Sequence, residues 1–285
     1  MIDLKGVAFQ DQGSERFALK DVNVSVAPGE FVGIIGPSGA GKTTLTQVLN
    51  GIVPHHRVGD FYGHALIAGR DTVTTLPAEL ARTVGSVFQD IEGQFVSAMV
   101  EDELLYALEN FGFDRAEIPG RIERALEAMG IAPLRHRSLG TLSGGQKQKV
   151  ALASTMALSP RLLVLDEPTG ELDPQSSLQV FELLRGFQRD LGTTVVVVEQ
   201  KIMLLCAFVH RLIVLKDGQV ALDGPVREVL ERAELLEEIG INCPRVTTLA
   251  SRLKARGWYQ GPAPLNVDEG EQVVRQVLSR REVMA

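Results

Sequence analysis

The chain has 285 residues, of which 45% are hydrophobic, so it can bury one large α/β core or two smaller units. Its formal net charge of −7 at pH 7 argues against a nucleic-acid partner, because no overall positive field is available to hold phosphate backbones. No apolar run approaches the length of about 20 residues that a membrane-spanning helix needs, and the N-terminus lacks the features of a signal peptide, so we expect a soluble chain made in the cytosol.

Strands are predicted at the start of the chain. Residues 19–26 alternate between apolar and polar side chains, which is typical of a half-exposed strand. A turn at residues 27–30 then leads to the apolar run at residues 31–35. The sequence therefore predicts a half-exposed strand followed by a buried one.

The buried strand ends at a sequence of the form G-x-x-x-x-G-K-[ST], and residues 44–49 after it are predicted to form a helix. In such a loop, glycines let backbone N–H groups point at phosphates, and the helix N-terminus faces the anion. Lys42 is expected to reach the β- and γ-phosphates, and the Thr43 hydroxyl to take a Mg²⁺ position. The residues predicted to hold the nucleotide are Gly36, Pro37, Ser38, Gly39, Ala40, Gly41, Lys42, Thr43 and Thr44. A glycine-rich turn without a ligand would leave the flanking strand and helix unexplained.

Three histidines after this loop suggest a metal site at first sight. They are His55, His56 and His64. No cysteine or carboxylate lies at a helpful spacing, so exposed polar loops are the favoured interpretation.

The middle of the chain is predicted to be helical. Between residues 101 and 129, apolar side chains recur at helical spacing, and Gly112, Pro119 and Gly120 interrupt the pattern. We expect these helices to be inserted between parts of the sheet.

The sequence Leu-Ser-Gly-Gly-Gln at residues 142–146 opens a further predicted helix. Its exposed N–H groups suit a second phosphate, but one triphosphate needs two such helix starts only if the second serves the ATP of a neighbouring molecule. This reasoning points to a head-to-tail dimer. The residues predicted to contact that nucleotide are Ser143, Gly144, Gly145 and Gln146. The simpler alternative is a helix capped by Ser143 with no ligand.

Two adjacent carboxylates end the apolar strand predicted at residues 162–165. Asp166 can hold Mg²⁺ through water, whereas Glu167 is directed differently and can polarise the attacking water. A solvated acidic turn would not explain their position behind four apolar residues. Further apolar strands at residues 194–198 and 211–215 predict a parallel sheet covered by helices on both faces.

The last part of the chain is predicted to be a helical tail. Residues 226–239 are rich in Glu and Leu at helical spacing, and Trp258 is expected to pin the tail to the core. Cys206 and Cys243 lack metal-site spacing, so free buried thiols are expected.

Together these motifs resemble the ATP-binding cassette (ABC) family, and residues 1–254 look most like the ATPases of energy-coupling-factor (ECF) importers. The most specific stretches are residues 87–90 with 94–96, 100–103 and 141–153. The resemblance implies an α/β fold with a P-loop ABC ATPase core at residues 1–225, formed by a mostly parallel sheet with an N-terminal antiparallel part. It also implies a helical subdomain inserted at about 90–157 and a C-terminal helical extension at 226–285, which in the family joins ATPase-to-ATPase contacts. For residues 226–239 the alternative is a plain solvated surface helix.

The resemblance also implies roles for single residues. Glu167 is the expected general base, and Gln89 is expected to link the γ-phosphate site to the helical subdomain. Mg²⁺ is expected near Thr43, Gln89 and Asp166, with Asp166 acting through water. Asp173 is expected at the dimer seam.

Two positions depart from the family pattern. Gln200 stands where a histidine usually contacts the γ-phosphate; glutamine can still donate a hydrogen bond but cannot carry charge, so we expect slower hydrolysis. Asp11 stands where an aromatic ring usually stacks on adenine. Phe9 or Phe17 could supply the ring, although core packing is the favoured role for both.

The function implied by the resemblance is ATP hydrolysis that drives import of a vitamin, a vitamin precursor or a metal ion. ATP and Mg²⁺ are the expected cofactors. The expected partners are a second ABC ATPase subunit, in a homodimer or heterodimer, a transmembrane scaffold and a small substrate-capture membrane protein. The chain is then peripheral, on the cytoplasmic face of the cell membrane. The alternatives are a soluble, non-transport ABC ATPase and the ATPase of another ABC transporter type.

Overall fold

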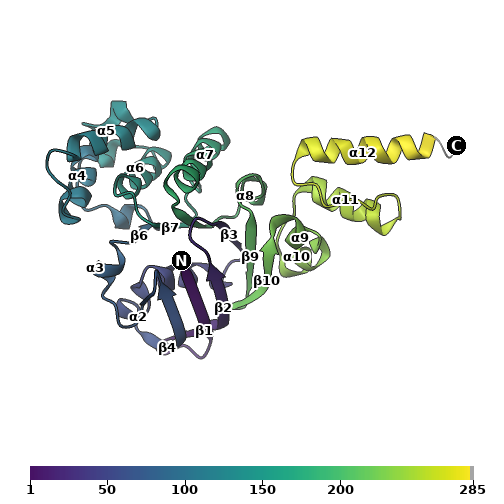
Figure 1. Ribbon diagram of the computed structural model, residues 1–285, viewed down its shortest axis with the longest axis horizontal. Helices are drawn as coiled ribbons and strands as arrows, with labels where there is room; N and C mark the ends of the chain where they lie inside the picture. The colour runs from purple at the N-terminus through teal and green to yellow at the C-terminus, as the bar shows by residue number, and fades with distance from the viewer. Residues whose placement is uncertain (283–285) are drawn as a thin grey trace.

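The computed structural model describes residues 1–282, and its largest sheet confirms the predicted α/β core (Figure 1). Six strands run in the order β10-β9-β3-β8-β7-β6, all parallel to their neighbours except the antiparallel pair β9 and β10. They are β3 (Phe31–Ile35), β6 (Val84–Val87), β7 (Leu162–Asp166), β8 (Thr194–Val198), β9 (Arg211–Lys216) and β10 (Gln219–Pro225). Every residue of β3, β7 and β8 is buried, which explains why their sequences are apolar almost throughout.

A second sheet is antiparallel and contains the N-terminus, as predicted. Its strands run in the order β2-β1-β4-β5. They are β1 (Ile2–Asp11), β2 (Phe17–Val26), β4 (Gly59–Ile67) and β5 (Arg70–Asp71). Along β2 the side chains of Val22, Val24 and Val26 are buried and those between them are exposed, which confirms the half-exposed strand. Helix α1 (Lys42–Leu49) shares an apolar core with this sheet, and the short helices α2 (Ile52–His55) and α3 (Pro77–Leu80) lie close by.

Helices fill the segment between β6 and β7. They are α4 (Val100–Asn110), α5 (Ile118–Ala128) and α6 (Gly144–Ala157), with 3₁₀ turns at Glu92–Gln94, Ala132–Leu134 and Leu139–Thr141. They form one group at the side of the larger sheet (Figure 1). The predicted interruption of the helical pattern lies between α4 and α5, and Pro119 and Gly120 stand just after it. Both lie in the first turn of α5, where proline costs little because the N–H that it lacks has no partner in the helix.

Two helices after β7 cover the centre of the sheet. They are α7 (Pro174–Leu191) and α8 (Ile202–Phe208). The ring of Phe31 on β3 stacks on Phe181 of α7 at 6.1 Å between centroids, and Phe181 contacts Phe208 of α8 at 5.4 Å. These rings fix both helices on the strand that leads into the phosphate loop.

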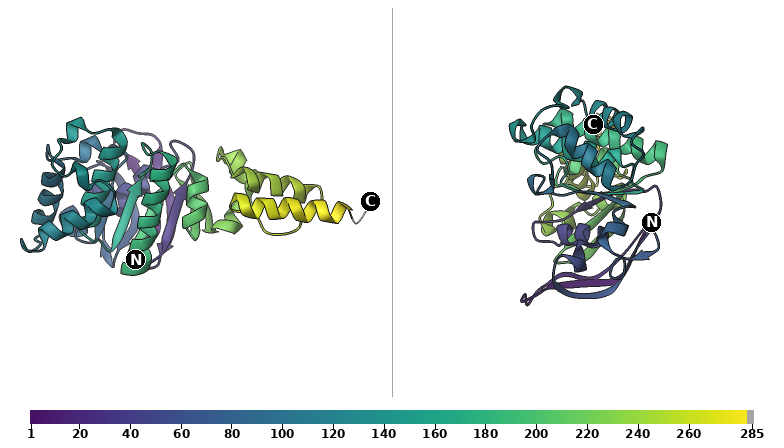
Figure 2. Two further views of the ribbon diagram at one scale, coloured as in Figure 1. Left: turned by 90° about the horizontal axis from the view of Figure 1, so that it is seen from above. Right: turned by 90° about the vertical axis from the view of Figure 1, so that its left-hand side faces the viewer.

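The C-terminal segment has two parts. Helices α9 (Val226–Leu230) and α10 (Ala233–Ile239) pack into the main core, so the single helix predicted for residues 226–239 is broken between them. Helices α11 (Arg245–Ala255) and α12 (Val267–Glu282) project from the body as a pair (Figure 2). No helix within residues 1–282 is long and apolar enough to cross a membrane.

The projecting pair has a small apolar cluster of its own. Tyr259 is buried there with Ala250, Val273 and Val277. Trp258, the residue expected to pin the tail, is 37% exposed and has Arg256 over its ring, whereas the adjacent Tyr259 provides the buried ring of this cluster. The two cysteines are free, but only Cys206 is fully buried. Burial raises the pKa of the Cys206 thiol to about 12 and that of Cys243 to about 11.

Candidate nucleotide site

The phosphate loop joins β3 to α1, and its glycines are required by its backbone shape. Gly39 and Gly41 have φ values of +76° and +97°, which glycine adopts at little cost. A Cβ on Gly36 would lie 2.4 Å from the carbonyl oxygen of Leu215 on β9. Gly41 caps α1 without any side-chain hydrogen bond, so no capping side chain occupies the first N–H groups of the helix. A helix start of this kind suits an anion.

Lys42 is the buried cation of this loop. Its ammonium donates hydrogen bonds to the carbonyl oxygens of Gly36 at 2.8 Å and Pro37 at 2.9 Å. Burial lowers the pKa of Lys42, although the nearby carboxylates of Glu167 and Asp166 act in the opposite direction. The charge therefore lies within the loop itself, where a phosphate would complete its surroundings.

Asp166 ends β7, and its buried carboxylate is only partly hydrogen-bonded. It is 3% exposed, its Oδ2 accepts a hydrogen bond from Thr46 at 3.4 Å, and its Oδ1 has no hydrogen-bond partner among the described residues. Burial raises the pKa of Asp166, and the hydroxyls of Thr43 and Thr46 partly counteract the rise. An orphaned carboxylate oxygen beside hydroxyls is the hard oxygen environment that Mg²⁺ prefers, so these residues fit the expected cation.

Glu167 has an unusual backbone. Its φ is +52°, a left-handed value that costs energy in a residue other than glycine and is often found at functional sites. The Glu167 N–H donates to the Val198 carbonyl at 2.9 Å. Gln200 Nε2 donates to Glu167 Oε1 at 2.6 Å. The structure therefore brings the two expected catalytic side chains into direct contact and holds one carboxylate oxygen in place.

A cavity of about 230 Å³ contains part of the expected nucleotide site. Residues of the phosphate loop line it together with Gln200 from the β8–α8 connection and Gly240 to Asn242 from the tail. Gln89, exposed in the segment after β6, is not one of its lining residues. The structure thus joins Lys42 and Gln200 but leaves Gln89 outside this cavity.

The Leu-Ser-Gly-Gly-Gln segment opens α6, as predicted. Ser143 Oγ accepts a hydrogen bond from the Gln146 N–H at 3.3 Å, and Gln146 Oε1 accepts one from the Ser143 N–H at 3.1 Å. Gln146 is therefore engaged in capping, which sequence reasoning did not foresee. A Cβ on Gly144 would lie 3.1 Å from Glu171 Oε2, and one on Gly145 would lie 3.1 Å from the Glu171 carbonyl oxygen. The glycines allow the helix start to pack against residues 171–172.

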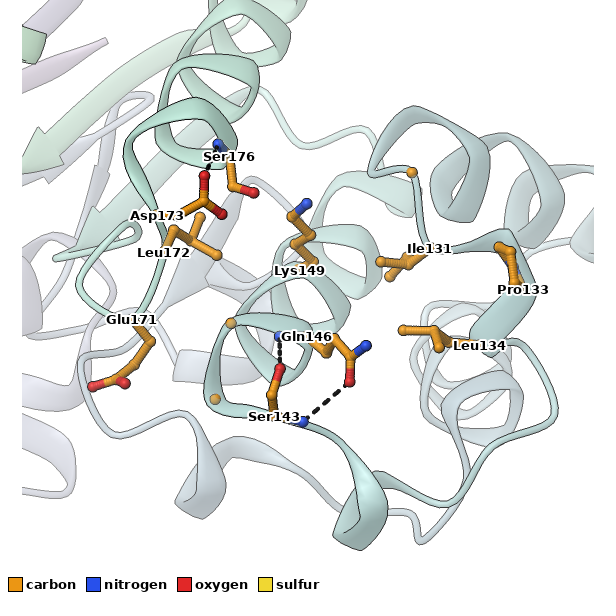
Figure 3. A pocket seen from close by; sticks show the side chains of 13 residues that line it. Ile131, Pro133, Leu134, Ser143, Gln146, Lys149, Glu171, Leu172, Asp173 and Ser176 are labelled. Carbon is orange, nitrogen blue, oxygen red and sulfur yellow. Dashed lines mark hydrogen bonds between the residues drawn. The ribbon is translucent and has the colours of Figure 1, made fainter.

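This helix start faces a cavity of its own, about 530 Å³ in volume (Figure 3). Ser143, Gly144, Gly145 and Gln146 line it together with Lys149, Glu171 and Asp173. Figure 3 shows Ser143, Gln146, Lys149 and Glu171 around one hollow, with Asp173 at the start of α7. The two cavities have no lining residue in common, so the two helix N-termini that are predicted to bind phosphate face different cavities.

Sequence reasoning missed Gln148, which is 1% exposed on α6. Its Nε2 donates to the Glu167 carbonyl at 2.9 Å, and its Oε1 accepts from the Glu171 N–H at 3.0 Å. The available signal was a glutamine on the helix face that also carries Ala151 and Leu152. Gln148 therefore connects the helix at one cavity to the backbone of Glu167, the expected general base.

Asp11, which replaces the expected aromatic residue, forms an ion pair. Arg57 Nε lies 2.5 Å from Asp11 Oδ1, and Arg57 Nη1 donates to Thr44 Oγ1 at 3.0 Å. Phe9 is fully buried in the core, as favoured, and Phe17 contacts Tyr62 at 6.1 Å between ring centroids. An ionic contact therefore lies beside Thr44 of the phosphate loop.

The histidines do not gather into a metal site. His55 Nε2 lies 2.8 Å from the Thr72 carbonyl oxygen, and the part of the chain that the structure describes has no group of three or more metal-binding side chains. His64 belongs to strand β4, so the loop expected there is wrong.

Comparison with known proteins agrees with this geometry. The family model for ABC transporters matches residues 19–170, more than half of the chain. A protein of Pyrococcus abyssi described as an ABC transporter ATP-binding protein is 39% identical over 90% of this chain and 92% of its own length.

Two solved structures are similar over nearly their whole length. CbiO1 of Clostridium perfringens, part of the ABC transporter complex CbiONQ, has a TM-score of 0.72 and 30% identity, and the match covers 87% of this chain and 97% of CbiO1. The ATP-binding cassette MJ0796, solved as a post-hydrolysis dimer with ADP and phosphate, has a TM-score of 0.71 and 29% identity, with 80% of this chain and 99% of MJ0796 covered. This chain therefore belongs to the ABC transporter family and is one of its ATP-hydrolysing subunits, with ATP and Mg²⁺ as cofactors.

Proposed function

We propose that this chain is the energy-coupling ATPase of an ECF-type importer that takes up a vitamin, a vitamin precursor or a metal ion. The observation that carries the proposal is the match to CbiO1, which extends over 87% of the chain, compared with 80% for MJ0796. Both solved structures are covered almost completely by their matches. The larger share of this chain that CbiO1 matches is therefore consistent with a similarity that includes more of the tail.

In the proposed ATP site, the phosphate loop binds the triphosphate and Glu167 is the general base. Lys42, already within the loop, exchanges carbonyl oxygens for phosphate oxygens. Asp166 and Thr43 would hold Mg²⁺ through oxygen atoms and water, with Gln89 approaching from the segment after β6. Bound Mg²⁺ would neutralise charge on the β- and γ-phosphates. Gln200 orients Glu167 through their 2.6 Å hydrogen bond.

The second cavity is proposed to receive the ATP of a partner ATPase. Its lining combines a helix N-terminus capped by Ser143, the N–H groups of Gly144 and Gly145, and the cation of Lys149, all of which suit a phosphate. Because this cavity is separate from that of Lys42, a second cassette is needed to place both sets of groups on one nucleotide. Asp173, which lines the same cavity, would then lie at the seam. The dimer is consistent with the dimeric state of MJ0796.

The tail is proposed to contribute to contacts between the two ATPases. Its loop at residues 240–242 lines the cavity that contains Lys42 and Gln200, so it lies beside the place where the partner would close. Helices α11 and α12 project from the body and offer further surface (Figure 2).

The proposed partners are a second ABC ATPase, a transmembrane scaffold and a small substrate-capture membrane protein, which would place the chain on the cytoplasmic face of the cell membrane. The test is to purify the tagged chain from native membranes in mild detergent and to identify bound proteins by mass spectrometry. Recovery of a polytopic scaffold with a small membrane protein supports the proposal. Recovery of a scaffold with a different substrate-binding component indicates another ABC transporter type, and ribosomes, DNA-bound proteins or no membrane protein would indicate a soluble cassette ATPase.

A further inference from the structure

Lys201 makes an unusual set of contacts directly after Gln200. Its ammonium donates hydrogen bonds to the carbonyl oxygen of Thr169 at 2.7 Å, the carbonyl oxygen of Leu172 at 3.1 Å and the hydroxyl of Ser177 at 3.0 Å. An ammonium has three donors, so these partners use all of them. All three acceptors belong to the loop at residues 169–173, hereafter the seam loop, or to the first turns of α7.

Glu199, on the other side of Gln200, contacts the same loop. It is 3% exposed, and its Oε2 accepts a hydrogen bond from Thr169 Oγ1 at 2.6 Å. Its Oε1 accepts the backbone N–H of Gln200 at 2.9 Å. Two consecutive contacts therefore tie the Gln200 backbone to Thr169, while the Gln200 side chain reaches Glu167.

The opposite side of the seam loop contacts α6, the helix that begins at the Leu-Ser-Gly-Gly-Gln segment. Gln148 of α6 accepts the N–H of Glu171, and Gly144 and Gly145 pack closely against Glu171. Glu171, Leu172 and Asp173 line the cavity of that helix start. One continuous set of contacts thus runs from Gln200 through Lys201 and the seam loop to the second cavity.

We propose that Lys201 is a positioning residue that transmits the state of the chain's own ATP site to the seam loop and, through it, to the cavity of the Leu-Ser-Gly-Gly-Gln segment. A γ-phosphate that engages Gln200 shifts the segment at residues 199–201, and the ammonium carries that shift to Thr169 and Leu172. Nothing in this connection depends on which transporter the chain serves, because every contact lies within one chain.

The test is hydrogen–deuterium exchange, read by mass spectrometry, on the full chain with and without AMP-PNP and Mg²⁺. In the wild type we expect AMP-PNP to slow exchange at residues 36–44 and also at residues 170–173. Lys201→Met removes all three hydrogen bonds of the ammonium and should raise exchange at residues 170–173 by about tenfold or more, since the loss of even one charge-assisted hydrogen bond gives a factor of this size. It should also abolish the nucleotide response of that loop while residues 36–44 remain protected by AMP-PNP.

Matched variants separate this role from a general loss of stability. Lys201→Arg, which keeps the charge, should restore the nucleotide response, and Lys20→Met on the exposed part of β2 should leave every peptide unchanged. If Lys201→Met unfolds the chain, Ser177→Ala removes only one acceptor and should still increase exchange at residues 170–173. The proposal is overturned if residues 170–173 of Lys201→Met or Ser177→Ala exchange at the wild-type rate. It is also overturned if AMP-PNP protects residues 36–44 of the wild type but leaves exchange at residues 170–173 unchanged. Lack of protection at residues 36–44 in the wild type would instead contradict nucleotide binding by the phosphate loop, and exchange without nucleotide would still test Lys201.

Discussion

Replacing Asp166 with asparagine should stabilise the nucleotide-free chain although it disables the site. The Asp166 carboxylate is 3% exposed, and its Oδ1 lacks a hydrogen-bond partner among the described residues. Attraction to Lys42 favours the ionised form, but burial has the larger effect, because the Asp166 pKa is raised overall. Folding therefore works against the charge, and Asp166→Asn removes the charge at almost constant volume.

The expected gain at pH 7 without Mg²⁺ is about 0.5–2 kcal/mol in the free energy of unfolding, the usual range for single stabilising replacements. For a chain of this size that is a rise of roughly 1–8 °C in Tm. The pH dependence of this gain in stability follows from the raised pKa of Asp166. The cost of the charge is present above the folded-state pKa, decreases as the pH falls through it, and disappears below the unfolded value of about 3.9.

The assay is thermal unfolding of wild type and Asp166→Asn in EDTA, over a pH series and then with saturating Mg²⁺ and ATP. The Tm of the variant should exceed that of the wild type by less in acid. With Mg²⁺ and ATP the wild type should have the higher Tm, because it gains more stability from the cation. Asp173→Asn is the control. The hydrogen bonds with Ser176 lower the Asp173 pKa, so its charge favours folding, and the variant should not gain stability. A lower Tm for Asp166→Asn than for wild type in EDTA at pH 7 would refute the reasoning.

Three further predictions concern the groups around Glu167. Glu167→Gln should keep ATP affinity, measured by titration calorimetry, and lower turnover by about 10²-fold or more because the general base is lost; full turnover would remove Glu167 from that role. Gln200→His should raise turnover in the assembled complex, measured as phosphate release, because imidazole adds a chargeable group near the γ-phosphate, and unchanged turnover contradicts the idea that Gln200 slows hydrolysis. Gln148→Met should lower the free energy of unfolding by about 2 kcal/mol, since both hydrogen bonds of the buried Gln148 amide are lost and the Glu171 N–H is left unpaired; denaturant unfolding at wild-type stability would show that neither bond matters.

Local chemistry explains why the front of the site was predictable. The run at residues 31–35 is apolar throughout because β3 is covered on both faces, and the glycines after it are needed for left-handed backbone and for close approach to Leu215. The position of Asp166 at the end of its strand and the role of Ser143 as a helix cap could be predicted for the same reason, because each depends on neighbouring residues in the sequence. The break between α9 and α10 was not readable, because the apolar spacing of residues 226–239 continues across it.

Long-range contacts were beyond sequence reasoning. Arg57 pairs with Asp11 across 46 positions, and Gln148, Gln200 and Lys201 each acquire their roles only when separate segments meet. Trp258 and Tyr259 are adjacent aromatic residues, and only packing against α11 and α12 decides that the second one is buried.

By itself, then, the sequence determined the chemistry available: a phosphate-binding loop, a second helix start for phosphate, and two carboxylates behind a buried strand. These follow from the conformational needs of glycine, the capping preference of serine and the apolar character of covered strands, all of which act over a few residues. Only the tertiary structure decided that the two helix starts face separate cavities, and that a buried glutamine and a lysine connect them. The physical reason is that hydrogen bonds between distant segments depend on where the packed core places each backbone, which no local pattern encodes.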